Sequence, residues 1–244
     1  MAENRSLLLR SIFIDWNEID ADSYLHRIPS LRTAEQLFFS SPVTLFSGEN
    51  GSGKSTLLEG IAVAYGFNPE GGNIHYNFST KDSHSELHSA IRLIRGARKA
   101  KWGYFLRAES FYNVATIEEE YSKGPGGIPQ HFHEKSHGES FLALVQNNFT
   151  GGGIFFLDEP EAALSPQRQL SLLIEIHRCA KEGAQFFIAT HSPILLGIPD
   201  AQILSFDDGT ISEIAYEDTD SYRVTSMFVN GRERFLKHLL TPEE

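Results

Sequence analysis

The segment GENGSGKST, residues 48–56, contains the residue types that a phosphate-binding loop needs. Its glycines would let backbone N–H groups curl around phosphate oxygens, and a helix that follows would add positive potential. Lys54 would reach the β- and γ-phosphates, and the Ser55 hydroxyl would ligate Mg²⁺. The predicted ATP-binding residues of this segment are Glu49, Asn50, Gly51, Ser52, Gly53, Lys54, Ser55 and Thr56. The pattern G-x-x-x-x-G-K-[ST] is complete, so nucleotide binding is favoured over a glycine-rich turn that binds nothing.

Two acidic residues follow the apolar run Ile154–Leu157 and could complete such a site. Asp158, at the end of an expected buried strand, is predicted to contact Mg²⁺. Glu159 is predicted to polarise the attacking water as a general base. Alone, the pair could equally be two strand-end carboxylates that face solvent. In the same chain as the phosphate loop, it indicates hydrolysis of a nucleoside triphosphate.

The segment HFHEKSHGES, residues 131–140, groups His131, His133 and His137 with two glutamates and two serines. Three histidines this close could bind Zn²⁺, although no fourth ligand is near. A nucleophile elbow is disfavoured, because the segment lacks the G-x-S-x-G pattern and no strand closely precedes it. Spacing alone does not decide between a metal site and histidines that are incidental.

Strands and helices that alternate along the chain would position these residues. Apolar runs and helical periodicity predict a strand at 43–46, helix at 54–65, loop at 68–83, helix over 85–101, strand at 102–108, helix at 139–149, strand at 154–158, helix at 166–182, strand at 185–190 and short strands near 203 and 211. The alternation is typical of an α/β fold around a mainly parallel sheet. The stretch from about 73 to 149 is more helical, and we expect it to form a lobe inserted into a core lobe of about 1–72 and 150–244.

Composition narrows the possible partners and compartments. The 244 residues carry a formal net charge of −11, which disfavours diffuse binding to nucleic acid or to an anionic membrane. Cys179 is the single cysteine, so internal disulfides and thiolate metal clusters are excluded. No stretch approaches the roughly 20 apolar residues of a membrane span, and we expect a cytoplasmic protein. One basic series could contact nucleic-acid phosphates, although a solvated face is favoured; it comprises Arg92, Arg95, Arg98, Lys99 and Lys101.

With the phosphate loop and the Asp158–Glu159 pair together, the chain resembles the ATP-binding-cassette (ABC) ATPases. That superfamily has an L-S-G-G-Q signature whose last residue precedes the Walker B aspartate by 19 residues, the separation of Glu139 and Asp158. The resemblance makes residues 131–140 part of a signature loop rather than a metal site. Ser136, His137, Gly138 and Glu139 match S-G-G-Q, with His137 in place of a glycine and Lys135 in place of leucine.

Two further segments support the resemblance. ATHSP places His191 at the position of the switch histidine, which makes it a predicted catalytic residue beside Lys54 and Glu159. EAALSP is similar to the D-loop that contacts the other subunit. Segments from about Ile28 to Leu240 resemble small stand-alone bacterial ATPases near the chromosome-maintenance and recombination-repair branch.

The resemblance implies a P-loop NTPase of ABC type that forms one domain over residues 1–244, with ATP and Mg²⁺ as cofactors. It also implies an ATP-gated head-to-tail homodimer in which Ser136, Gly138 and Glu139 contact the ATP of the partner subunit. A Q-loop glutamine is absent, and Glu109 is the positional substitute as a Mg²⁺ ligand. The candidate adenine-stacking aromatics are Tyr24, Phe38 and Phe39.

Three functions stay open from the sequence. The first is a soluble ATPase in DNA repair, maintenance or defence. The second is the ATP-binding subunit of a membrane transporter. The third is a nucleotide-sensing regulator with slow turnover and an unidentified protein partner. The missing Q-loop glutamine disfavours the transporter, since transporters couple to their membrane subunits there.

Overall fold

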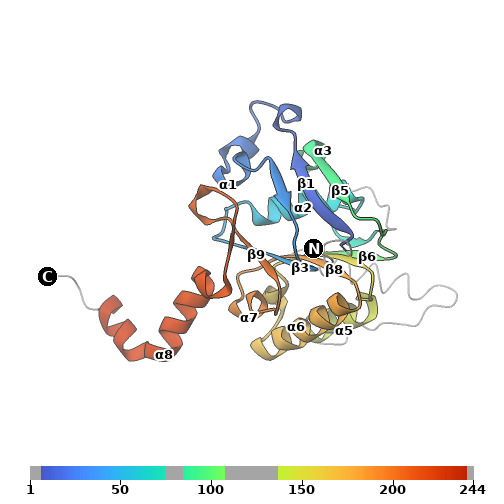
Figure 1. Cartoon of the computed structure of the whole chain (residues 1–244). Helices are drawn as coiled ribbons and strands as arrows, with labels where there is room; N and C mark the ends of the chain where they lie inside the picture. Colours follow the sequence, from blue (N-terminus) through green and yellow to red (C-terminus); the bar gives the residue numbers. More distant parts are fainter. Residues whose placement is uncertain (1–6, 75–84, 108–136, 241–244) are drawn as a thin grey trace.

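The structure is a computed structural model that describes residues 7–74, 85–107 and 137–240 (Figure 1). Within those ranges, seven strands form the main sheet in the order β10-β9-β3-β8-β7-β6-β4. Their bounds are β3 Val43–Ser47, β4 Gly72–Asn73, β6 Gly103–Arg107, β7 Ile154–Asp158, β8 Gln185–Ala189, β9 Gln202–Ser205 and β10 Ser212–Ile214. The five central strands pair in parallel, and the edge strands β10 and β4 are antiparallel. The predicted α/β fold with a mainly parallel sheet is confirmed.

The central strands are apolar throughout because both faces of the sheet are covered. Every residue of β3, β7 and β8 is buried, as is typical of parallel strands between two layers. The register aligns Phe46 and Asp158 with Ala189, so β3 and β7 end on either side of the end of β8. Segments that follow these three strands therefore meet at one edge of the sheet.

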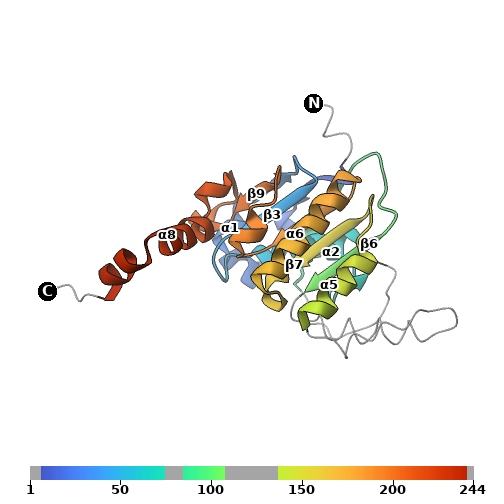
Figure 2. The ribbon, with the colours of Figure 1, turned by 90° about the horizontal axis from the view of Figure 1, so that it is seen from below.

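Helices on the two faces form two cores. On one face, α2 (Lys54–Tyr65) shares a core with β1 (Leu9–Ile14) and the main sheet. On the other face, α5 (His137–Asn148) and α6 (Pro166–Lys181) pack against the sheet (Figure 2). The remaining short helices are α1 Pro29–Arg32, α3 Leu87–Ala90, α7 Pro193–Leu196, η2 Trp16–Glu18, η3 Tyr24–Arg27, η5 Pro160–Ala163, η6 Asp207–Gly209 and η7 Tyr216–Asp218.

A second sheet has the order β2-β1-β5 among the described residues, and both of its pairings are antiparallel. Its strands β2 (Gln36–Phe38) and β5 (Ile91–Arg95) flank β1. The helix predicted over 85–101 is therefore wrong, because only α3 is helical there. Leu87, Ile91 and Ile94 fit helical spacing, but β-branched Ile91 pairs with Ile14 and Ile94 pairs with Ser11 of β1.

These strands affect the expected inserted lobe. Strand β5 belongs to the second sheet and β6 to the main sheet, so neither contributes to a helical layer. The described helices of the expected signature lobe are the short α3 and α5. The division into a core lobe and a lobe of about 73–149 stays a prediction, because residues 75–84 and 108–136 lie outside the described ranges.

One buried amide links the two sheets. The Gln185 side chain, at the start of β8, is 1% exposed. Its Oε1 accepts hydrogen bonds from the Leu8 and Leu9 backbone N–H groups at 2.9 and 2.8 Å, and its Nε2 donates to the Leu9 carbonyl at 2.8 Å. The start of β1 is thus anchored to the start of a central strand of the other sheet.

Helix α8 (Asp220–Leu240) extends away from both sheets in the two views (Figures 1 and 2). None of its residues is buried, and its backbone leaves the helical conformation at Gly231 (φ −141°, ψ 36°). Within the described ranges, no helix combines the length and the apolar character that crossing a membrane requires.

Candidate nucleotide-binding site

The predicted phosphate loop connects the end of β3 to the start of α2. Gly48, Gly51 and Gly53 have φ values of 146°, 82° and 99°, a region that side chains rarely adopt. A Cβ on Gly53 would also lie 2.8 Å from Cγ2 of Ile28. The glycines therefore set the curvature of the loop, which ends on the N-terminus of a 12-residue helix that favours anions.

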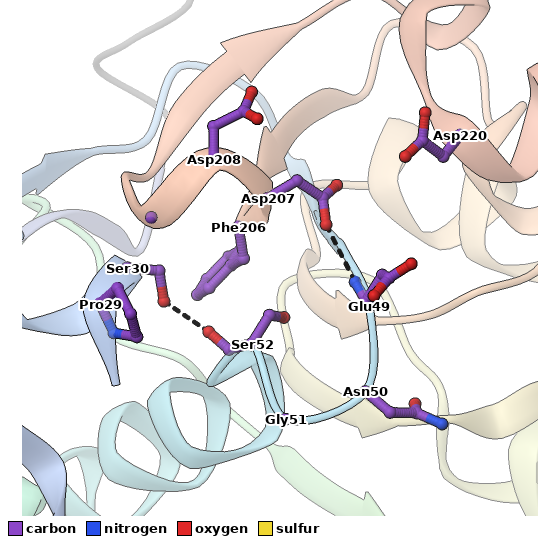
Figure 3. A pocket seen from close by; sticks show the side chains of 11 residues that line it. Pro29, Ser30, Glu49, Asn50, Gly51, Ser52, Phe206, Asp207, Asp208 and Asp220 are labelled. Carbon is purple, nitrogen blue, oxygen red and sulfur yellow. Dashed lines mark hydrogen bonds between the residues drawn. The ribbon is translucent and has the colours of Figure 1, made fainter. Parts of the chain in front are cut away.

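Two segments distant in the sequence hold this loop. The Ser30 hydroxyl of α1 donates to the Ser52 carbonyl, and the Glu49 N–H donates to the Asp207 carboxylate of η6 at 3.0 Å (Figure 3). Neither Ser30 nor Asp207 was predicted as a site residue, since no motif marks them. They fix the backbone of the loop from both sides.

A pocket of about 420 Å³ lies beside the outer side of the loop (Figure 3). Four acidic residues line it: Glu49, Asp207, Asp208 and Asp220. Carboxylates repel phosphate groups, so this pocket is not assigned to the triphosphate, which fits the helix N-terminus and Lys54 instead.

Lys54 is 4% exposed, and its ammonium donates to the carbonyls of Gly48 at 2.7 Å and Glu49 at 2.8 Å. Burial lowers the pKa of Lys54 below its ordinary value of 10.5, while nearby carboxylates, Glu159 foremost, oppose this effect. The loop backbone therefore surrounds the Lys54 ammonium, at the position where a bound phosphate would lie.

Ser55 and Asp158, the two predicted Mg²⁺ ligands that the structure describes, are in contact. The Ser55 hydroxyl donates to Asp158 Oδ1 at 2.7 Å, from the first turn of α2 to the end of β7. A hydroxyl and a carboxylate supply the hard oxygen ligands that Mg²⁺ prefers, so the residues present fit this ion. Glu109, the third predicted ligand, lies outside the described residues.

Arg107 is a site residue that sequence reasoning missed. It ends β6, pairs in register with Asp158, and places Nε 3.7 Å from Asp158 Oδ2. Its Nη1 also lies 2.6 Å from Oε2 of Glu59, one turn after Ser55 on α2. The signal was a charged residue at the end of the apolar run GYFL. Arg107 thus connects the two elements that carry the predicted Mg²⁺ ligands.

Glu159 and His191 come together at the carboxyl edge of the sheet. Glu159 adopts the left-handed region (φ 48°, ψ 50°), and its N–H donates to the Ala189 carbonyl at 2.9 Å. Its Oε1 lies 3.7 Å from Nε2 of His191, slightly beyond hydrogen-bond distance. Glu161, which was not predicted, accepts from the His191 N–H at 2.6 Å and the Ser192 N–H at 3.2 Å. The strained backbone of Glu159 directs its side chain to the edge where His191 begins the next loop.

The described part of the predicted signature lies against the D-loop of the same chain. A Cβ on Gly138 would lie 2.6 Å from Nη1 of Arg168 and 3.0 Å from the Ala163 carbonyl, so only glycine fits without a shift. Glu139 Oε1 lies 3.0 Å from Nη2 of Arg168. This contact joins the start of α5 to the start of α6. The predicted contact with ATP of a partner subunit stays a prediction.

Several predicted residues lie outside the description. Ser136 and the histidines His131 and His133 fall in residues 108–136, and of His137 only the helical backbone is described. The zinc alternative for these histidines is therefore not tested.

Of the three aromatic candidates for adenine stacking, Phe39 belongs to the core. It is 1% exposed and packs edge-on against Phe187 with ring centroids 4.7 Å apart. Tyr24 and Phe38 are exposed, so they remain the candidates for that role.

Comparisons with known proteins agree with these motifs. A model described as "AAA domain" matches residues 24–139, and one described as "AAA domain, putative AbiEii toxin, Type IV TA system" matches residues 140–197. A ribose import ATP-binding protein of Bacillus cereus is 24% identical over 227 residues, which cover 82% of this chain and 45% of that protein. A hemin import ATP-binding protein of Rhodopseudomonas palustris is 26% identical over 167 residues, which cover 59% of this chain and 63% of that protein. The chain thus spans less than half of the ribose import relative.

Two solved structures with a similar fold are an SMC head domain and an ATP-binding cassette. The SMC head domain from Thermotoga maritima has a TM-score of 0.46 and 14% identity, and the match covers 85% of this chain and 98% of that one. MJ1267, an ATP-binding cassette of an ABC transporter, has a TM-score of 0.45 and 17% identity, with coverage of 95% and 98%. The two AAA models meet inside the predicted signature and together span both carboxyl-edge motifs and the phosphate loop. The chain is thus similar to AAA-domain proteins and to ATP-binding proteins of the ABC type.

Proposed function

We propose that this chain binds Mg²⁺-ATP at the loop of residues 48–56 and hydrolyses it. The observation that carries the proposal is the 2.7 Å hydrogen bond between Ser55 and Asp158. It places a hydroxyl and a carboxylate together next to Lys54, at the edge where Glu159 also lies. Lys54, Ser55 and the loop N–H groups would hold the β- and γ-phosphates, and Ser55 with Asp158 would hold Mg²⁺.

The residues of the chain divide the chemistry between them. Lys54 would exchange its hydrogen bonds to two loop carbonyls for hydrogen bonds to phosphate oxygens. Bound Mg²⁺ would neutralise charge on the β- and γ-phosphates. Glu159 would orient the attacking water and accept its proton as the oxygen attacks the γ-phosphorus. His191, held through its N–H by Glu161, would lie beside that water and the γ-phosphate.

The proposal includes an ATP-gated head-to-tail homodimer. In this arrangement the Ser136 hydroxyl and the Gly138 N–H would contact the γ-phosphate bound by the partner subunit. Glu139, which follows them, is about half exposed and pairs with Arg168 in its own chain. The support is the resemblance to ABC ATPases and the packing that fixes Gly138 next to the D-loop.

Two biological settings remain candidates. The curated relatives are named as import ATP-binding proteins, which supports an ATP-binding subunit of a transporter. A role in DNA repair, maintenance or defence rests on the AAA-domain models. It is weakened because arginines of the basic series, which could contact DNA phosphates, have partners within the chain. Arg92 pairs with Asp15 at 2.8 Å, and Arg95 lies 4.5 Å from the centroid of the Tyr65 ring. These arginines lie on strand β5, not on one face of a helix.

The test compares Lys54→Ala with Lys101→Ala, a control on an exposed lysine outside the loop. Binding of a fluorescent ATP analogue and release of phosphate are measured with Mg²⁺ and with a chelator. Lys54→Ala should lose both activities, and Lys101→Ala should keep them. Unchanged binding by Lys54→Ala would refute the site. Turnover that rises with duplex DNA at low salt would support the repair setting, and turnover that rises only with membrane-embedded importer subunits would support the transporter.

A further inference from the structure

Helix α8 exposes an apolar face that its own chain does not cover. The helix has 21 residues with none buried, and it leaves the body of the molecule in both views (Figures 1 and 2). Val224 and Met227 are each 53% exposed, and Phe228 is 38% exposed. The backbone is non-helical at Gly231, so each half of α8 is shorter than the roughly 12–15 residues below which an isolated helix is marginal in water unless a partner covers its apolar side. Both AAA models end before residue 198, so α8 is an addition to the part that they describe.

The apolar positions form one continuous seam. Val224 and Phe228 lie one turn apart before the non-helical backbone at Gly231, and Phe235 and Leu239 lie one turn apart after it. The rings of Phe228 and Phe235 meet edge-on across the bend at Gly231, with centroids 6.0 Å apart. A Cβ on Gly231 would find nothing within 4 Å, so the seam has an open position at its centre.

Charge along α8 changes sign from one end to the other. Just before and at its start, Glu217, Asp218 and Asp220 outnumber Arg223, which pairs with Asp218. The second half carries Arg232, Arg234 and Lys237 against Glu233. A second α8 in the same direction would place like charges together. A second α8 in the opposite direction would pair the basic end of each copy with the acidic start of the other.

We propose that α8 pairs with α8 of a second copy of this chain, antiparallel and around a two-fold axis near Val229 and Asn230. In this register Phe228 lies against the open position at the partner's Gly231, and Lys237 lies near the partner's Asp220. A two-fold pair uses the same patch twice, so one self-complementary face covers both seams. The pairing needs no ATP, and the proposal does not depend on the proposed function.

The experiment measures the mass of the full chain by light scattering coupled to gel filtration, without nucleotide and over a range of concentrations. Wild type should elute at twice the chain mass of 27.3 kDa. Phe228→Asp should weaken the dimer by roughly 30-fold or more, since an aromatic at the centre of the interface would be lost. Ser226→Asp adds the same charge on the opposite face of the helix and should leave the dimer intact.

A charge exchange tests the direction of pairing. Lys237→Glu should weaken the dimer, and adding Asp220→Lys in the same chain should restore it, because each copy then carries both reversed partners. Far-ultraviolet circular dichroism confirms that each variant is folded. A wild type that is monomeric at every concentration would overturn the proposal. The same holds if the monomer binds anionic vesicles, since α8 would then contact a membrane surface and not a second copy. A dimer that Phe228→Asp does not affect would also overturn the proposal, and absence of rescue would overturn the antiparallel register.

Discussion

The hydroxyl of Ser55 donates a hydrogen bond of 2.7 Å to Oδ1 of Asp158, which lies 103 residues further along the chain. This contact joins the first turn of α2 to the end of β7, so it fixes the Asp158 carboxylate relative to the predicted phosphate loop. Ser55→Ala removes both the contact and a proposed Mg²⁺ ligand. We expect the Mg²⁺ concentration needed for half-maximal ATP-analogue binding to rise by about tenfold or more. A fluorescence titration checks this, and binding in chelator should match wild type. An unaltered Mg²⁺ requirement would contradict the assignment.

Glu159→Gln keeps the shape of the side chain but removes the base. Phosphate release should fall by about 10²–10⁴-fold while ATP still binds. ATP that is bound but not hydrolysed would hold the proposed head-to-tail homodimer together. Light scattering in Mg²⁺-ATP, carried out in a Phe228→Asp background, should then show a stable dimer that disappears in chelator. If the double variant stays monomeric at saturating ATP, the ATP-gated homodimer is refuted. If its turnover is normal, the catalytic role of Glu159 is refuted.

Arg107 pairs with two carboxylates, Glu59 and Asp158, and its removal takes this cation away from both. Arg107→Met should lower the free energy of unfolding by about 2 kcal/mol, the range for hydrogen bonds to charged groups. Adding Glu59→Met should recover part of that loss, because the two residues are in contact. Urea denaturation of the two single variants and the double variant measures the coupling. Arg178→Met, which removes ion pairs of a half-exposed arginine with Glu175 and Glu182 on one helix, is the control and should change stability little. Additive effects of Arg107→Met and Glu59→Met would show that the pair is not coupled.

Burial lowers the pKa of Lys54 below 10.5, and this gives a definite pH dependence. As pH rises through the lowered pKa, the free loop loses the ammonium that phosphate needs. ATP-analogue affinity should therefore start to fall below pH 10.5, by up to about tenfold per pH unit for one proton. The free energy of unfolding should rise over the same window, because there the unfolded chain binds more protons than the folded one. Lys54→Arg does not titrate in this range, so its weaker binding should stay flat. A flat profile in wild type would contradict the role of Lys54.

The sequence predicted the elements that carry the chemistry, because their signals are local. The apolar run Ile154–Asp158 and the helix Lys54–Tyr65 have the predicted bounds. Strand β5 was mistaken for a helix, since the spacing of its isoleucines suits either structure until the pairing with β1 decides. The second sheet depends on pairings between distant segments, which no local pattern reveals.

The same distinction applies to the site. Lys54, Ser55 and Asp158 follow from motifs, and the structure brings them together. Arg107 contacts Glu59, which lies 48 positions away in the sequence, and Asp207 contacts Glu49, which lies 158 positions away. Their roles arise from the order of strands in the sheet, so they could be identified only after the fold was known.

The three hydrogen bonds of the Gln185 side chain make the two sheets depend on each other for stability. If the start of β1 separated, a buried amide would lose all three partners at once, at a cost of about 1–3 kcal/mol for each unsatisfied group. Local fraying of the N-terminal strand is therefore suppressed, and β1 and β8 should open as one cooperative unit. Amide hydrogen exchange should give Leu9 and Phe186 similar opening free energies. Gln185→Leu should make Leu9 exchange much faster and leave Phe186 slow, so that one cooperative unit becomes two.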